Sequence, residues 1–278
     1  MNTMPTSSFA SGQPTRSHAF TPLRHWPAEL LTRERRLALY GALLLALLLP
    51  MALAWGLDER TLRGANVWIK PMKFALSIAV LALTTAWFVG HLPADQRASR
   101  ATDRIVWLLI GTGSFELVYI ALQAGLGEGS HYNVGDAFHG TMYTLMGIGA
   151  LVLTATQPML AWQLYRHPDT SRPAAYRHAV LIGLVLTFVF GASIGGLLST
   201  QQPPSDGVTL PLFGWSLGGG DLRPAHFVGI HAGQVLPFIG FIATAYSLRH
   251  ARAAVWAATL AYSALFAGLV VWGLPGRL

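Results

Sequence analysis

The sequence predicts an all-α, polytopic membrane protein with seven transmembrane helices. Of its 278 residues, 53% are hydrophobic and only 11% are charged, a balance too apolar for an ordinary soluble domain. Seven segments each hold about 20 mostly apolar residues, the length that crosses a hydrocarbon core of about 30 Å. The predicted spans are about 37–57, 68–90, 104–126, 136–160, 177–198, 225–247 and 253–274.

The distribution of basic residues predicts the orientation, because Lys and Arg near span ends are retained in the cytoplasm. Placing the N-terminus inside puts thirteen of the nineteen basic residues on the cytoplasmic side and six outside, with the C-terminus outside. We therefore expect a multi-pass protein of a cell membrane, the inner membrane in a bacterium. The strongly basic composition reflects this topology and attraction to the anionic lipid of the bilayer, so nucleic acid is not an expected partner.

Two parts are predicted along the chain. Residues 1–36 are rich in Ser, Thr, Pro and Arg and read as a disordered basic cytoplasmic tail, with a short interfacial helix near Trp26. Residues 37–278 form the seven-helix transmembrane domain. Within it, spans 37–57 and 253–274 carry no Asp, Glu, His, Lys or Arg and are predicted to serve as scaffold. Small residues in span 177–198 predict close helix packing.

Two lysines open the second span. Lys70 and Lys73 are the only lysines of the chain and lie three residues apart, on one helical face. They stand on the predicted outer side, which the positive-inside rule depletes of cations. Either they extend to the lipid headgroups or they face a bound anion.

A polar stripe runs along the third span. Glu116, Tyr119 and Gln123 are spaced three and four apart and share one face of the helix. Glu116 falls near mid-bilayer, where an acidic group costs about 2.5–3.5 kcal/mol unless it is protonated or paired. It is either part of a functional site or a protonated acid that makes a structural hydrogen bond.

The stretch from Ser130 to His139 leads into the fourth span. Asp136 and His139 are three apart, and Tyr143 continues their face one turn deeper. Asp136 has an alternative explanation as a helix N-cap, whereas His139 lies about 6 Å inside the span. We expect His131 to lie on the loop surface.

The longest outer loop, from Ser199 to Pro224, is predicted to fold over the outer face as a lid. It leads into a second polar span entry with Arg223, His226, His231 and Gln234. His226 and His231 are five apart and point in different directions around an unbroken helix, which disfavours one metal bound from one face.

Because the spans alternate in direction, these polar residues gather in one outer layer with Glu116 beneath it, and we expect no embedded His, Lys or acid at the cytoplasmic span ends. The layer is predicted to hold a small molecule or cofactor. The favoured interpretation is b-type haem for electron transfer, with His139 and His231, or His226, as ligands and Lys70, Lys73 and Arg223 on the propionates.

Two alternatives remain open. A divalent metal could bind His139, His231 and Asp136, with Glu116 completing the site, in a hydrolase or other metalloenzyme acting on a lipid; the chain has no cysteine to offer. The third possibility is a transporter of a small anion, coupled to protons, in which His and acids relay protons and lysines bind the solute. In each case Tyr143, Gln123 and Gln234 would support the central groups.

Overall fold

The computed structural model describes residues 26–204, 207–211, 213–246 and 249–274, which are mostly helical. The helices are α1 (Trp26–Arg33), α2 (Arg35–Leu57), α3 (Ile69–Val89), α4 (Ala94–Arg97), α5 (Arg100–Leu126), α6 (Ala137–Arg166), α7 (Ala174–Thr200), α8 (Arg223–Ile230), α9 (Ala232–Ala245) and α10 (Ala251–Gly273). Two antiparallel hairpins lie in loops, β1 (Thr61–Leu62) with β2 (Ala65–Asn66) and β3 (Thr209–Leu210) with β4 (Trp215–Ser216).

Six helices are long and apolar enough to cross a membrane: α2, α3, α5, α6, α7 and α10. Helices α8 and α9 pass the same test together and form a seventh, broken span if they are counted as one. The predicted helical membrane architecture is therefore confirmed, and the helix limits follow the predicted spans to within a few residues. The exposed side chains along the helices are largely apolar, for example Leu49, Leu53 and Leu260 at 75%, 64% and 69% exposure.

The prediction of one continuous span over 225–247 is wrong. Helices α8 and α9 meet at His231 with a bend of 49°. Pro237 has no N–H to donate to the carbonyl of Gly233, one turn earlier in α9. The N–H of Gly233 instead donates to Thr187 Oγ1 of α7 at 2.8 Å, so the neighbouring helix stabilises the break.

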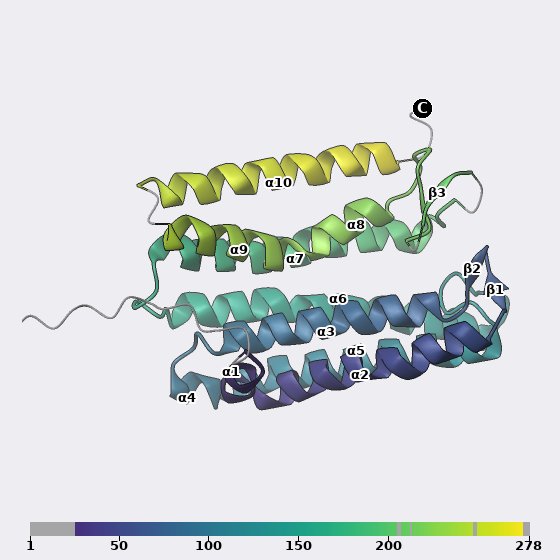
Figure 1. Ribbon diagram of the computed structural model, residues 1–278, viewed down its shortest axis with the longest axis horizontal. Helices are drawn as coiled ribbons and strands as arrows, with labels where there is room; N and C mark the ends of the chain where they lie inside the picture. The colour runs from purple at the N-terminus through teal and green to yellow at the C-terminus, as the bar shows by residue number, and fades with distance from the viewer. Residues whose placement is uncertain (1–25, 205–206, 212, 247–248, 275–278) are drawn as a thin grey trace, which may run out of the picture.

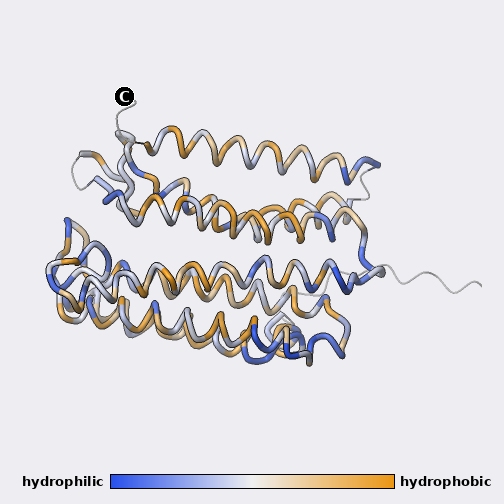
Figure 2. Tube along the Cα trace, turned by 180° about the vertical axis from the view of Figure 1, so that it is seen from behind, coloured by the Kyte–Doolittle hydropathy of each residue, from blue (hydrophilic) through white to orange (hydrophobic). Residues whose placement is uncertain are grey.

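The helices lie side by side in two groups, one of α2, α3, α5 and α6 and the other of α7 to α10 (Figure 1). Helix α7 joins them, since it packs against α6 and also against α8 and α9. Both β-hairpins lie at one end of the bundle, the hairpin end, and α1 and α4 lie at the other, the α4 end. Figure 2 shows hydrophobic residues along the middle of the helices and hydrophilic ones towards both ends.

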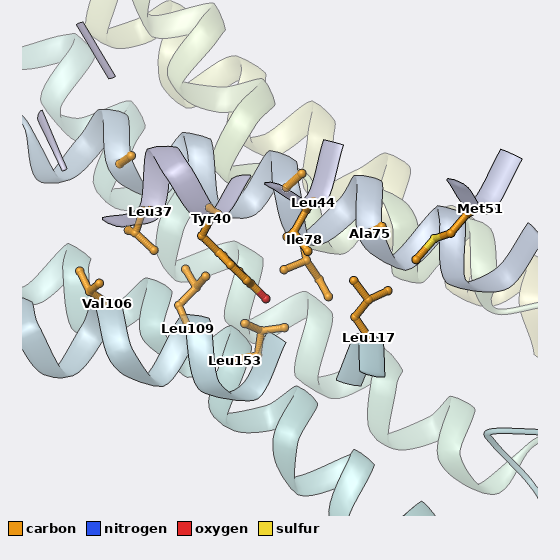
Figure 3. Packing of buried hydrophobic residues seen from close by; sticks show 13 residues of the cluster. Leu37, Tyr40, Leu44, Met51, Ala75, Ile78, Val106, Leu109, Leu117 and Leu153 are labelled. Carbon is orange, nitrogen blue, oxygen red and sulfur yellow. The ribbon is translucent and has the colours of Figure 1, made fainter. Parts of the chain in front are cut away.

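The largest core cluster joins α2, α3 and α5, with Leu153 of α6 at its edge (Figure 3). Tyr40 of α2 points its hydroxyl towards α5, where it accepts a hydrogen bond from Ser114 Oγ at 3.2 Å. In the second group, a Cβ at Gly183 of α7 would lie 2.8 Å from the Ala232 carbonyl oxygen. This close approach of α7 and α9 requires glycine and agrees with the predicted packing role of α7.

The predicted tail lies only partly within the described residues. Residues 1–25 are outside them, but 26–36 are helical, forming α1 and the start of α2, so the prediction of disorder is wrong for this part. The short helix expected near Trp26 is present as α1. Arg33 pairs with Glu29 within α1 at 2.6 Å and fixes the helix to the bundle by donating to the Trp87 carbonyl oxygen at 3.0 Å.

Candidate functional site

The most deeply buried acid of the transmembrane helices is Glu116 of α5. Its side chain is 1% exposed, and its Oε1 atom has no hydrogen-bond partner among the described residues. Helix α6 leaves space for this carboxyl because it has a glycine, Gly149, at the contact. A Cβ atom added to Gly149 would lie 2.9 Å from Oε1 and 3.4 Å from Phe115 Cδ1. Such a group must be protonated or find an opposite charge, since an unpaired buried charge is costly.

Lys70 is a cation that acts on this carboxyl. It lies in the first turn of α3, is partly buried and interacts electrostatically with Glu116. Of the two predicted lysines, Lys70 is therefore the one that serves the buried carboxyl. Whether Lys70 faces a bound anion stays a prediction from the sequence.

The structure adds His131 to this group and corrects the expectation that it lies on the loop surface. The ring is half-buried, with centroids 5.9 Å from the Phe74 ring and 5.8 Å from the Tyr143 ring. Ser130 Oγ lies 3.2 Å from His131 Nδ1. Burial, together with the charge of Lys70, lowers the pKa of His131 to about 3, so the imidazole is neutral at pH 7.

The predicted stripe on α5 faces the interior. Gln123 donates from Nε2 to Tyr119 Oη at 2.8 Å, and both side chains are buried. Gln123 Oε1 has no hydrogen-bond partner among the described residues and is available to a donor. Together these side chains form the buried polar cluster: Lys70, Glu116, Tyr119, Gln123 and His131.

His139 lies apart from this cluster. Asp136 is the N-cap of α6 and accepts from the His139 N–H at 2.9 Å, as the capping explanation predicted. The imidazole is held by two carboxylates, with Nδ1 2.5 Å from Asp136 Oδ2 and Nε2 2.9 Å from Glu128 Oε2. These acids occupy opposite ring nitrogens, so they do not converge on one point with the histidine.

The divalent-metal hypothesis finds no support in this geometry. Within the described part of the chain, no group of three or more His, Asp and Glu side chains is placed to hold a metal ion.

The second predicted polar segment, from Arg223 to Gln234, lies in the group of helices α7 to α10. His231 stands at the α8–α9 break, its ring centroid 4.4 Å from that of Phe227 and its Nδ1 3.2 Å from Gln234 Oε1. Gln234 Nε2 donates to Thr84 Oγ1 of α3 at 3.3 Å and so links the two groups. His226 packs beside Gly195 of α7, and its buried Nδ1 has no partner among the described residues.

A haem between His139 and His231 would need facing helices at that point. Helix α7 packs against α6 on one side and against α8 and α9 on another, while His139 is already held by two acids. Haem ligation by this pair stays a prediction from the sequence.

The long loop between α7 and α8 is held over the hairpin end by hydrogen bonds from both groups of helices. Lys73 Nζ donates to the Phe213 carbonyl oxygen at 2.8 Å. Tyr143 Oη donates at 2.7 Å to the carbonyl oxygen of Ser199, which lies in the last turn of α7 and not in the loop as predicted. Arg223 donates to the Gly214 carbonyl oxygen at 2.7 Å and pairs with the buried Asp221 at 2.6 Å. These contacts give Lys73 and Arg223 a role in positioning the loop; anion binding by them stays a prediction.

The expectation that no histidine is embedded at the predicted cytoplasmic ends is wrong. His91, just after α3, is 5% exposed, and its Nε2 has no hydrogen-bond partner among the described residues. Its ring packs edge-on against Phe88 and Tyr176 at 5.5 and 5.7 Å. The only signal in the sequence is its place directly after an apolar helix end.

Comparison of the chain with protein-family models, with curated proteins and with solved structures finds no match. The polar clusters of the structure are therefore the features that indicate a function.

Proposed function

We propose that this protein is a proton-coupled carrier of a small anion, in a cell membrane. Glu116 binds the proton and Lys70 binds the anion. The observation that carries the proposal is the carboxyl of Glu116, 1% exposed within a membrane-length helix, with Oε1 unpartnered among the described residues and Lys70 as its electrostatic partner. Intramembrane ionisable groups with such partners mark substrate and proton pathways.

The coupling follows from the charge balance of the pair. Without solute, the ammonium of Lys70 compensates the carboxylate of Glu116. When an anion pairs with Lys70, the carboxylate of Glu116 is no longer compensated. In a low-dielectric environment the protonated, neutral carboxyl then has the lower free energy, so Glu116 takes up a proton. Anion and proton therefore bind together, and the occupied site carries no more net charge than the empty one.

The hairpin end gives the entry to this site. Lys70 lies in the first turn of α3 at that end, and it interacts electrostatically with His131 in the loop between α5 and α6. The loop over this end is held by the Lys73 contact, which must open for a solute to enter. The excess of basic residues at the α4 end supports an orientation with the hairpin end outside.

A pH-jump experiment tests proton binding without knowledge of the solute. The purified protein is reconstituted into liposomes and adsorbed to a solid-supported membrane, and the transient current is recorded on acidification. We expect a protein-dependent current that is lost in Glu116→Gln. The matched control is Glu59→Gln, which neutralises an exposed acid of the loop between α2 and α3 and should keep the current.

A current that is absent in the wild type, or unchanged in Glu116→Gln, would contradict the proposal. Circular dichroism of the reconstituted variants confirms that each remains helical, so that a lost current reports the carboxyl and not unfolding.

A further inference from the structure

A second polar site lies at the α4 end, across the bundle from the proposed carrier site and independent of it. A cavity of about 190 Å³ opens there between the end of α6, the start of α7 and the turn after α3. The polar side chains that line it are His91, Asp169, Arg172, Tyr176, Arg177 and His178.

The charged groups of this cavity favour an anion. Arg172 Nε donates to Asp169 Oδ2 at 2.9 Å, and Arg177 Nη1 donates to the Asp169 carbonyl oxygen at 3.1 Å. A guanidinium has five N–H donors, so both arginines retain donors for a ligand. The two guanidinium groups and the one carboxylate give the cavity a net positive charge. Asp169 Oδ1 already accepts hydrogen bonds from the N–H and the Oγ of Ser171.

The start of α7 adds to this potential. The helix begins at Ala174 after Pro173, and no side chain caps its first N–H groups. Ala174 and Ala175 line a different cavity, so these N–H groups add the positive end of a 27-residue helix near the site but are not its donors.

His91 points independently to a ligand. The side chain is 95% buried, lines the cavity, and has an Nε2 atom without a partner among the described residues. Burial, with the charges of Arg172 and Arg33 adding to it and that of Asp169 opposing it, lowers the pKa of His91 to about 3. The neutral ring can carry its proton on Nε2 and donate it in a hydrogen bond to an anionic oxygen. Such a ligand would give the buried Nε2 atom the hydrogen-bond partner that it lacks, and so remove the free-energy cost of leaving it unpaired.

We propose that this cavity binds a phosphate group, held by Arg172 and Arg177, with His91 donating from Nε2. Planar guanidinium groups match phosphate oxygens in geometry and charge. The phosphate belongs either to the headgroup of an anionic phospholipid or to free phosphate, since the cavity lies at the end of the membrane-length helices.

Thermal unfolding of the delipidated protein in detergent tests the site. Inorganic phosphate is titrated in one series, and phosphatidylglycerol or phosphatidylcholine in two others. Binding to the folded state raises Tm in a saturable manner. A rise with phosphate and phosphatidylglycerol supports the site for either source, and a rise with phosphatidylglycerol alone assigns it to the lipid headgroup.

Variants locate the effect. His91→Phe keeps the aromatic packing against Phe88 and Tyr176 but removes the donor, and we expect the apparent Kd to rise about tenfold or more. Arg172→Gln is a second variant that should weaken binding, with Tm without ligand showing that each variant folds. The control is Arg104→Gln, which removes an exposed arginine of α5 outside the cavity lining.

Absence of any ligand-dependent rise in the wild type would overturn the proposal. So would an undiminished rise in both His91→Phe and Arg172→Gln, or an equal loss in Arg104→Gln, because the effect would then be general attraction to positive charge.

Discussion

Replacing Lys70 by Met tests whether it compensates the buried charge of Glu116. Glu116 lies ten residues before the end of α5 at Leu126, which a rise of about 1.5 Å per residue places roughly 15 Å below that end. This depth is about half of a hydrocarbon core of about 30 Å. An uncompensated acid at that depth costs about 2.5–3.5 kcal/mol. We therefore expect Lys70→Met to lower the free energy of unfolding by about 3 kcal/mol.

The assay is equilibrium unfolding in mixed detergent micelles, arranged as a double-mutant cycle with Glu116→Gln. Because each single variant leaves one partner uncompensated, the double variant should be more stable than the sum of the two losses implies, by at least about 1 kcal/mol. Lys73→Met is the matched control, since Lys73 donates to a loop carbonyl and should show no coupling to Glu116. Additive losses, to within about 0.5 kcal/mol, would refute the pairing of Lys70 with Glu116.

Further predictions concern the surroundings of the cluster. Gly149→Ala places a methyl group 2.9 Å from Glu116 Oε1 and should displace the carboxyl, reducing the pH-jump current while the helix content stays unchanged. The pKa of His131 is lowered to about 3, so the unfolded chain binds more protons than the folded one between that value and about 6.5; stability should fall as pH drops through this window. In His131→Gln the fall of Tm on acidification should be smaller, and an unchanged slope would contradict the assignment. Tyr143→Phe removes the contact of α6 with the last turn of α7, from which the long loop leaves, and should raise the susceptibility of that loop to proteolysis, measured by mass spectrometry. The visible spectrum tests the haem alternative, because a Soret band lost in His139→Ala would favour haem over the carrier.

The helices could be predicted well because their signal is local. A hydrocarbon core requires about 20 apolar residues per span, and the runs of this length coincide with the helices of the structure. The break at His231 could not be read in the same way. It is stabilised by Thr187 of another helix, which accepts the N–H of Gly233. A hydropathy pattern contains no information about such a tertiary partner.

The site could be predicted in part. The stripe with Glu116 and Gln123 was found because polar side chains are costly within a span and must turn inward. The partners could not be predicted, because they come from distant parts of the chain. Lys73 donates to Phe213, 140 residues away, which spacing within the second span does not show.

His91 was missed for the same reason. It follows α3 at a position typical of a loop, and its burial arises partly from Tyr176 at the start of α7. Burial produced by a distant element leaves no pattern around the buried residue itself.

Infrared difference spectroscopy of the reconstituted protein tests the central claim most directly, because it observes the carboxyl group itself. Spectra are compared between alkaline and acidic buffer for the wild type and Glu116→Gln. The account predicts a carbonyl-stretch band of a protonated carboxyl that appears on acidification in the wild type and is missing in the variant. A band of equal size in both proteins, or none in either, would contradict proton binding by Glu116.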